Sequence, residues 1–290
     1  MEKFISQEED ILINVLRNNL KKYSKNNIKS FLTKEMVLVN NKVQTRYDYL
    51  VHKTDKIEIR ETKIKVSKIK NDLNIIYEDD DLIVVNKPYG LLSIATKEEK
   101  EYTLYHFVSD YLKGKNKNNK VFIIHRLDKD TSGIVIFAKN QRIKNMFQNN
   151  WDSIIRERKY YAVVNGILKD KEGTIKNYLV ENDKSFMVYS TKNKNAGKLS
   201  ITDYKVLKEN KDYSLLDINI KTGRKNQIRV TFKDLGNPIV GDKKYGDGKS
   251  LIKRMALHQY KIELIDPRNN KKIIFKTEMP TSFKKLIKSR

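Results

Sequence analysis

Residues 125–133, with the sequence HRLDKDTSG, carry a dense group of side chains able to do chemistry. Eight of the nine are polar or glycine, although apolar runs typical of buried strands stand on both sides. Arg126, Asp128 and Asp130 place a guanidinium and two carboxylates within five residues. Such a group could bind a metal ion, supply a nucleophile or a base, or form a polar turn. Each use makes a different demand on the rest of the chain.

A calcium loop of the EF-hand type is excluded by the position of its last ligand. Its first, third, fifth and sixth positions are matched by Asp128, Asp130, Ser132 and Gly133. The twelfth position must supply a bidentate glutamate, and here it is Lys139. Calcium binding is therefore not expected.

Two other uses of the segment stay open at this point. A metal-dependent phosphotransferase would need further carboxylates around a magnesium ion, and Arg126 beside the acidic pair opposes cation binding. A purely structural turn would use Asp128 as a cap and Gly133 at a positive φ angle. The turn interpretation predicts nothing about other motifs, so those motifs can test it.

The charge of the chain favours a polyanionic partner. Sixty lysines and arginines stand against 36 acidic residues, a net charge of +24, and such a field attracts nucleic acid. The chain is also rich in Lys, Asn and Ile, as AT-rich coding produces, so part of the lysine excess has no functional cause. Lysine that only solubilises a surface is usually matched by glutamate, however, and here it is not.

The composition also excludes several classes of site. The chain has no cysteine, and its four histidines, His52, His106, His125 and His258, lack the paired spacing of metal ligands. No window approaches the ~18 consecutive apolar residues of a membrane helix. The acidic N-terminus lacks the apolar core of a signal peptide. We therefore expect a cytoplasmic protein that needs no metal and no cofactor.

The N-terminal part has the pattern of a separate small domain, since 290 residues suggest about two domains. In residues 9–22, apolar side chains recur on one helical stripe: Ile11, Leu12, Val15, Leu16 and Leu20. Ser24 is typical of the N-cap of a second helix, and the Asn-Asn pair in 37–43 favours a tight hairpin. We assign residues 1–60 to a small helical and β domain and the basic segment 61–74 to a linker.

Residues 75–290 are rich in strand patterns, with fewer helical ones. Their order is mixed rather than regularly alternating, which is typical of α+β folds. We predict a mixed, largely antiparallel β-sheet flanked by helices and loops. Residues 102–112 and 141–151 have helical patterns, and the apolar residues of the first should face inward: Leu104, Phe107, Val108 and Leu112.

The segment HRLDKDTSG followed by IVIFAK resembles the signature of the RluA/RluD family of RNA pseudouridine synthases. Five further blocks resemble family segments, one before this signature and four after it, in the order that the family has: NKPYGLLS (86–93), RKYYAVVNG (158–166), KTGRKNQIRV (221–230), NPIVGDKKYG (237–246) and ALHQYKIELIDP (256–267). The resemblance makes 75–290 a catalytic domain. Residues 10–60 resemble the small RNA-binding domain shared with ribosomal small-subunit protein four.

The resemblance implies a role for each of five residues in the catalytic domain. Asp128 is the essential carboxylate, ionised and protected from water. Arg229 is its partner, and Tyr160 lies against the uracil face. Arg126 fills the space left by a flipped base or holds the flipped strand. Ile228 lines the pocket.

Other residues are expected to support these. Lys25 and Lys29 of the small domain would contact RNA phosphates. His125 is expected to be a structural hydrogen-bonding residue. The remaining residues expected to brace the loop or surround the site are Lys87, Asp130, Thr131, Ser132 and His258, while Gly133 would let the backbone turn.

The chain departs from the family pattern at four positions. Lys225-Asn226 replaces a Thr-His or Ser-His pair, and Thr231 replaces a histidine. We expect these to alter packing or RNA contact rather than activity. Arg158 stands where lysine is common and keeps the charge.

The resemblance implies an RNA pseudouridine synthase that acts without metal or cofactor. It would isomerise uridines in structured RNA, with large-subunit (23S) ribosomal RNA as the first expectation and transfer RNA as the second. We expect a monomer without a membrane partner. The alternative is a non-catalytic RNA-binding or ribosome-assembly protein that keeps the same fold.

Overall fold

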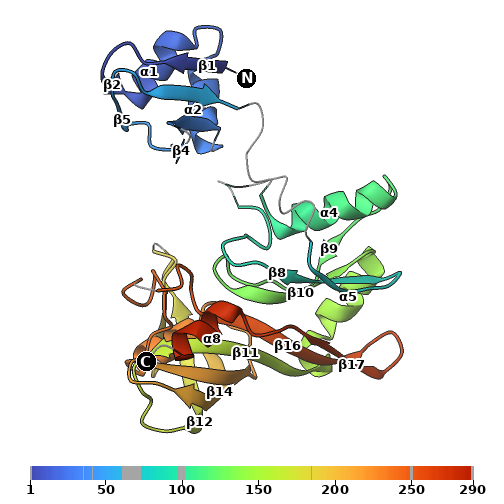
Figure 1. The fold of residues 1–290 in the computed structure, drawn as a ribbon. Helices are drawn as coiled ribbons and strands as arrows, with labels where there is room; N and C mark the ends of the chain where they lie inside the picture. The colour runs from blue at the N-terminus through green and yellow to red at the C-terminus, as the bar shows by residue number, and fades with distance from the viewer. Residues whose placement is uncertain are drawn as a thin grey trace. The chain divides into compact units, whose positions relative to one another are not determined.

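The computed structural model describes residues 2–34, 36–40, 42–60, 73–96, 99, 102–183, 185–248 and 251–288. By its internal contacts the chain divides into two compact units, Met1–Asp72 and Leu73–Arg290 (Figure 1). Most of the linker expected at 61–74 lies outside the described residues. None of the helices described is long and apolar enough to cross a membrane.

The first unit contains two helices, α1 (Leu12–Asn19) and α2 (Lys25–Thr33), and two small sheets. The four-stranded sheet has the order β1 (Glu2–Ile5), β6 (Lys56–Ile59), β3 (Val37–Val39) and β4 (Lys42–Val43). The other sheet pairs β2 (Asp10–Ile11) with β5 (Leu50–Val51). The buried faces of α1 and α2 pack with the strands in one apolar core.

Local sequence signals explain most of this unit. The Ser24 hydroxyl accepts a 3.2 Å hydrogen bond from the Asn27 amide, which confirms the N-cap. Asn40 has a φ angle of 50° in the turn between β3 and β4, as the hairpin prediction requires. The helical stripe was wrong at one position. Ile11 belongs to β2 and is exposed, and Ile13 is buried instead.

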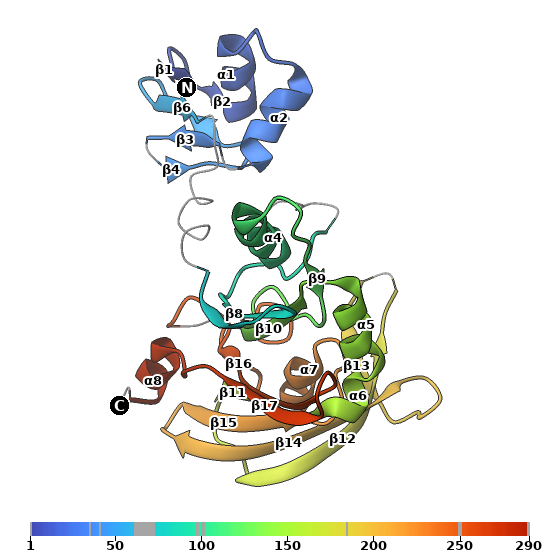
Figure 2. The same ribbon diagram turned by 90° about the vertical axis from the view of Figure 1, so that its right-hand side faces the viewer.

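The second unit is built on an 11-stranded sheet (Figures 1 and 2). Its strands are ordered β13 (Val188–Thr191), β12 (Glu172–Glu181), β14 (Lys198–Glu209), β15 (Tyr213–Ile220), β11 (Ile155–Asn165), β16 (Leu257–Asp266), β10 (Ser132–Ala138), β8 (Leu82–Lys87) and β7 (Ile75–Glu78). Off this path, β17 (Lys271–Lys276) pairs with β16, and β9 (Phe122–Ile123) pairs with β10. The pairing is antiparallel except between β10 and β16, so the predicted fold class is confirmed.

Five helices are described in this unit: α4 (Leu104–Lys115), α5 (Gln141–Asn149), α6 (Trp151–Ile154), α7 (Gln227–Asp234) and α8 (Thr281–Lys288). The four residues expected to face inward from α4 are all buried. Helix α7 packs against β12, β13 and β14 (Figure 2). Helix α5 packs against β10. The strands β12 and β13 were not predicted, because β12 is largely exposed and lacks a clear alternation of apolar residues.

Strand β10 continues directly from segment 125–133 and fixes where that segment lies. All seven of its residues are buried, and its even-numbered positions pack on Ile143 and Phe147 of α5. Truncating Phe147 to alanine would cost about 3–5 kcal/mol, the usual range for a buried phenylalanine. The segment is therefore attached to a rigid central strand.

Gly133 is required by the parallel contact between β10 and β16. Its φ angle is 123°, and a Cβ atom there would lie 2.1 Å from the backbone oxygen of Gln259. No side chain fits in that space, so only glycine lets the two strands approach. We expected Gly133 to serve a turn. Its actual function is to bring the end of segment 125–133 against β16.

Candidate active site

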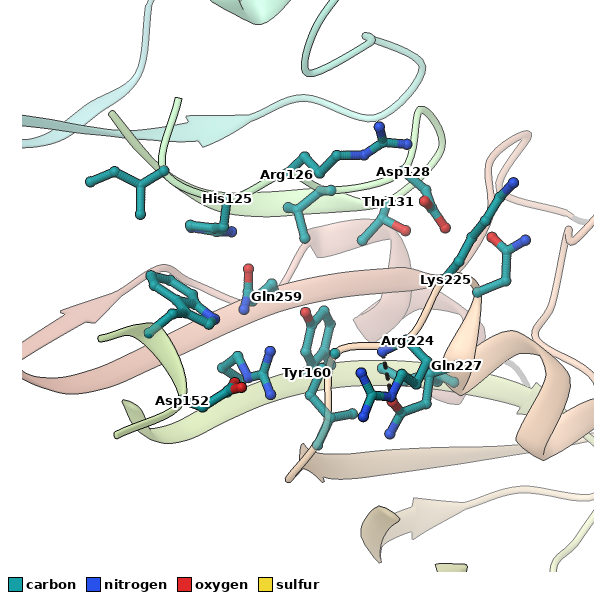
Figure 3. A pocket seen from close by; sticks show the side chains of 18 of the residues that line it. His125, Arg126, Asp128, Thr131, Asp152, Tyr160, Arg224, Lys225, Gln227 and Gln259 are labelled. Carbon is teal, nitrogen blue, oxygen red and sulfur yellow. Dashed lines mark hydrogen bonds between the residues drawn. The ribbon is translucent and has the colours of Figure 1, made fainter. Parts of the chain in front are cut away.

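A pocket of about 990 Å³ opens beside segment 125–133 (Figure 3). Its lining includes all five site residues predicted in the second unit: Arg126, Asp128, Tyr160, Ile228 and Arg229. They come from β11, from α7 and from the segment before β10. Lys25 and Lys29 belong to the first unit and are exposed on α2.

The loop that carries Asp128 is held through its backbone. The Thr131 amide donates a 3.1 Å hydrogen bond to the Asp128 carbonyl, which closes the turn. The hydroxyl of Ser93 donates to the Leu127 carbonyl at 2.7 Å and accepts from the Leu127 amide at 3.1 Å. Because these contacts use main-chain atoms, they fix the loop and leave the Asp128 carboxylate free.

The side chain of Lys87 holds the same loop through a second set of hydrogen bonds. The side chain is fully buried, and its ammonium donates to the carbonyls of Pro88, Leu91 and Lys129 at 3.0, 2.7 and 3.0 Å. Burial lowers the pKa of Lys87 to about 7, against the opposing field of Asp130 and Asp128. Lys87 therefore ties the 88–91 segment to the loop that carries Asp128.

Asp128 is more exposed than the sequence led us to expect. Its side chain is 30% exposed, and its Oδ2 lies 3.6 Å from Nη1 of Arg229. That separation brings the two charges together without a short hydrogen bond. The protein alone does not remove this carboxylate from water.

The hydrogen-bonded partner of Arg229 is Asp242, which the sequence analysis did not select. Nε and Nη2 of Arg229 donate to the two oxygens of Asp242, both at 2.7 Å, in a bidentate pair. Nη1 donates to Oδ1 of Asn226 at 3.1 Å. Asp242 was visible as the acidic residue of the NPIVGDKKYG block, but nothing in the sequence linked it to Arg229.

The Asp242 carboxylate is completely buried and ionised. Burial alone would raise its pKa, but hydrogen bonds from Arg229 and from the amides of Lys244 and Tyr245 outweigh that effect. They hold the pKa of Asp242 below its ordinary value. Arg229 thus enters the pocket with its charge already paired and its orientation fixed.

The aromatic residues on β11 are assigned by the alternation of the strand. Tyr160 is 7% exposed and lines the pocket, whereas Tyr161 stacks on Tyr260 with ring centroids 3.8 Å apart. Burial raises the pKa of Tyr160 to about 12, so its phenol stays neutral at physiological pH. Figure 3 shows its ring standing inside the pocket.

The remaining predicted residues have simple positions. Arg126 is exposed on the rim of the pocket, and Ile228 is buried in its wall. His125 stacks on Trp151, and its Nε2 accepts a 3.2 Å hydrogen bond from the Ile136 amide. Burial lowers the pKa of His125 to about 3, so the ring is neutral and structural.

The expected braces divide into two groups. The Ser132 hydroxyl lies 2.8 Å from Nδ1 of His258, and Nε2 of His258 lies 2.8 Å from the Thr277 hydroxyl. The contact between Ser132 and His258 joins β10 to β16. Thr131 is buried and its amide closes the turn. Asp130, however, is exposed, so it is not a buried brace of the loop.

One departure from the family pattern contacts the site directly. Asn226 has a φ angle of 54° at the N-terminus of α7, accepts from Arg229, and donates to the Tyr245 hydroxyl at 3.0 Å. Position 226 therefore contacts Arg229, and the expectation that the departure leaves activity intact stays a prediction. Lys225 forms an ion pair with Glu181. Thr231 is buried, and its hydroxyl has no hydrogen-bond partner among the residues described.

The rest of the pocket is also polar. Its lining adds Trp151, Asp152, Arg158, Arg224 and Gln259 to the residues above. No group of three or more histidines, aspartates or glutamates in the described part of the chain is placed to hold a metal ion.

Comparison with known proteins identifies the class of this site. The family described as RNA pseudouridylate synthase matches residues 81–234, more than half of the chain. Ribosomal large subunit pseudouridine synthase D of Borreliella burgdorferi is 36% identical over 72% of this chain and 66% of its own length. The uncharacterized RNA pseudouridine synthase YhcT of Bacillus subtilis is 29% identical over 100% of this chain and 97% of its own.

A solved structure agrees at the level of the fold. Human RNA pseudouridylate synthase domain containing 4 superposes with a TM-score of 0.61 at 22% identity, covering 74% of this chain and 92% of that one. The chain belongs to the RNA pseudouridine synthase family and is an enzyme of that class. The class predicted from the sequence is confirmed.

Proposed function

We propose that the protein converts uridine to pseudouridine in large-subunit (23S) ribosomal RNA and that Asp128 is its essential carboxylate. The observation that carries the proposal is the position of Asp128, which faces the pocket 3.6 Å from Arg229 with Tyr160 in the same lining. Relatives named ribosomal large subunit pseudouridine synthase D support ribosomal RNA as the substrate. Transfer RNA is the second candidate.

The reaction is an isomerisation that needs no other reactant. The N1–C1′ bond breaks, a C5–C1′ bond forms, the C5 proton is lost and N1 gains a proton. Asp128 can take part by attacking C1′, by attacking C6, or by removing a sugar proton, and each route needs an ionised carboxylate. Arg229 stabilises that ion without neutralising it, because Asp242 already takes its two short hydrogen bonds.

The target base must leave the RNA stack before Asp128 can reach it. Tyr160 would receive the extruded ring, and stacking of a base on an aromatic side chain contributes about 1–3 kcal/mol. Arg126, exposed at the rim, would occupy the vacated stack or contact a phosphate. The bound RNA would then cover Asp128 and supply the exclusion of water that the protein alone does not.

The first unit would provide sequence-tolerant affinity, in line with its resemblance to the RNA-binding domain of ribosomal protein four. In this assignment residues 1–60 form the RNA-binding domain, 61–74 the linker and 75–290 the catalytic domain. Lys25 and Lys29 are exposed neighbours on α2, at the spacing that puts both on one helix face. Replacing either by alanine should weaken RNA binding by a similar factor for all sequences. The slope of log affinity against log salt should fall by about one.

The alternative is a non-catalytic RNA-binding protein that acts in ribosome assembly. In such a protein a partly exposed carboxylate would repel the RNA phosphates and weaken RNA binding. Asp128 would then lower the affinity for RNA without contributing to a reaction. The position of Asp128 thus agrees with the enzyme class stated above, and we propose that the enzyme works as a monomer.

The test is to map pseudouridine in ribosomal RNA taken from a strain that lacks the gene, before and after incubation with the purified protein. New pseudouridine at defined sites supports the proposal, and Asp128→Asn should produce none. Asp130→Asn is the matched control, since it changes an exposed carboxylate in the same loop. Modification that persists in Asp128→Asn would reject Asp128, and modification of transfer RNA alone would reject the ribosomal substrate.

A further inference from the structure

Two buried polar groups in the pocket have no hydrogen-bond partner among the described residues: Nε of Arg158 and Oε1 of Gln259. Arg158 is 8% exposed and Gln259 is 1% exposed, and both line the pocket. A buried donor or acceptor left unpaired costs about 1–3 kcal/mol. Two of them side by side with the candidate catalytic residues therefore point to a partner that arrives with the substrate.

Strand geometry places both groups beside the ring of Tyr160. Gln259 is the register partner of Tyr160 across the β11–β16 pair, next to a register shift between Lys159 and Tyr160, and both residues line the pocket. Arg158 is two residues before Tyr160 on β11 and so lies on the same face. A base that stacks on Tyr160 would have both groups at its edge.

The guanidinium of Arg158 lies close to the backbone of Gly223. A Cβ atom on Gly223 would lie 2.6 Å from its Nη1, and Gly223 does not have a positive φ angle. A side chain at position 223 would therefore meet the end of the Arg158 side chain and require its guanidinium to move. The titratable neighbours of Arg158 are Tyr160, Asp152 and Arg224, whereas those of Arg229 are Asp242, Asp128 and Tyr245. Arg158 and Arg229 thus serve different ends of the pocket.

The geometry of uracil fits this arrangement. In the ring, C6 stands opposite N3, and C6 is flanked by N1 and C5, the two atoms that exchange in the reaction. A base that presents this edge to Asp128 directs its N3–H and its two carbonyls the other way. Figure 3 shows Gln259 above and to the left of Tyr160 and Asp128 above and to its right.

We propose that Gln259 and Arg158 read the imide edge of the target uracil: Oε1 of Gln259 accepts from N3–H, and the guanidinium of Arg158 donates to a neighbouring carbonyl. Cytosine has an unprotonated N3 and would leave Oε1 unpaired. The imide edge also presents the same order of one donor between two acceptors after the detached base has rotated by half a turn about the C6–N3 axis. N3–H stays in place while O2 and O4 exchange, so the same two side chains hold the base before and after the turn.

This inference rests on the proposed function and is tested with synthetic RNA containing the uridine mapped as described above. One RNA carries uridine and a second carries N3-methyluridine at that position. Because substrate and product have equal mass, the nucleosides are separated by liquid chromatography after digestion and identified by their fragments in tandem mass spectrometry. Wild-type protein should prefer uridine by at least about a hundredfold, since a site built to bond a polar group rejects an analogue that cannot pair. Gln259→Met should react more slowly with uridine and reduce that preference at least about tenfold.

The stability of Gln259→Met separates recognition from a structural role. The substitution replaces an unpaired buried amide by an apolar group of similar size, so the thermal midpoint should stay level or rise. Gln141→Met, on the exposed first turn of α5, is the matched control and should keep the wild-type preference. A Gln259→Met variant with the wild-type preference would overturn the proposal.

Arg158→Lys completes the test. It keeps the charge and loses the planar fork, so it should lower the rate on uridine RNA while the dissociation constant for RNA changes less than about twofold. Equal losses of affinity for both RNAs would make Arg158 a phosphate contact and overturn its assignment. Wild-type protein that leaves every ribosomal uridine unmodified would refute the proposed function itself, a result distinct from either of these.

Discussion

Two carboxylates lie on either side of Arg229, and they differ in almost every physical respect. Asp242 is completely buried and accepts two hydrogen bonds of 2.7 Å from the guanidinium. Asp128 is 30% exposed and lies 3.6 Å from the same group. The arginine is thus fixed by one acid and directed at the other.

The difference indicates how the fold keeps a reactive ion available. A carboxylate held by a bidentate arginine and two backbone amides is too well satisfied to attack a substrate. One that has only a longer contact keeps its lone pairs free and still lies in a positive field. Most of the stabilising interaction is therefore made at Asp242, which leaves Asp128 available for the role that we propose for it.

The largest effect expected from this comparison is on activity at Asp128. Asp128→Asn should lower the rate by at least about 10²–10⁴-fold, the range for one positioned acid–base group. The free energy of unfolding should change by less than about 1 kcal/mol, since the contact with Arg229 is long and partly solvated. Single-turnover kinetics and urea denaturation check both values. A large loss of stability would show that Asp128 is a structural partner of Arg229.

Asp242→Asn, unlike Asp128→Asn, should lower the free energy of unfolding strongly. Removing one partner of a buried ion pair leaves an uncompensated charge and costs about 3–5 kcal/mol of folding free energy. The pKa of Asp242 is lowered in the folded state, so the pair contributes stability above the ordinary aspartate pKa and loses it as pH falls through the folded value. Urea denaturation from pH 7 down to pH 3 should show a steeper decline for wild type than for the variant. Parallel curves would contradict the pairing.

Lys87 sharpens the comparison because it holds the loop of Asp128. Its pKa of about 7 lies below the ordinary lysine value of about 10.4. Between these values the unfolded chain binds more protons, so the stability of wild type should rise with pH relative to Lys87→Met, by up to a few kcal/mol. Activity should fall over the same range, because a neutral amine has two N–H donors for three carbonyls. Superimposable stability curves for the two proteins would contradict this.

The smallest effect is expected at Asn226, which holds the third nitrogen of Arg229. Asn226→Gly tolerates the φ angle of 54° and removes only the amide, so it should lower activity a few-fold and stability by about 0.5–1.5 kcal/mol. Asn226→Ala adds backbone strain of about 1–2 kcal/mol and should be less stable than the glycine variant. Measured activities equal to wild type in both variants would remove Asn226 from the site.

Periodicity and motifs in the sequence predicted the elements that carry the site. The inward face of α4 and the cap at Ser24 follow from local spacing, whereas the family resemblance selected Tyr160 for the pocket, and the structure has all three. The failures depend on contacts between distant segments. Asp242 meets Arg229 only after the 237–246 loop has turned back onto α7, and Gln259 reaches the pocket only because β16 lies between β10 and β11.

Exposure is a second property that spacing did not predict. The motif implied that Asp128 is shielded, but its solvent contact depends on what lies across the pocket mouth. Ile11 was assigned to a helical stripe because its spacing fits, although strand β2 takes it instead. In both cases contacts with other parts of the chain, rather than local spacing, decided the environment of the residue.

The central claim is that Asp242 fixes Arg229 while Asp128 acts on the substrate. Its most direct test is a crystal structure with substrate RNA whose target uridine carries fluorine at C5. The fluorine cannot leave as the proton does, so the final step is blocked and the complex is held near the reacting state. We predict an Asp128 oxygen against C1′ or C6, the ring on Tyr160, and Arg229 still bidentate to Asp242. A target nucleotide whose reacting carbons lie away from Asp128, with that carboxylate turned to solvent, would contradict the account.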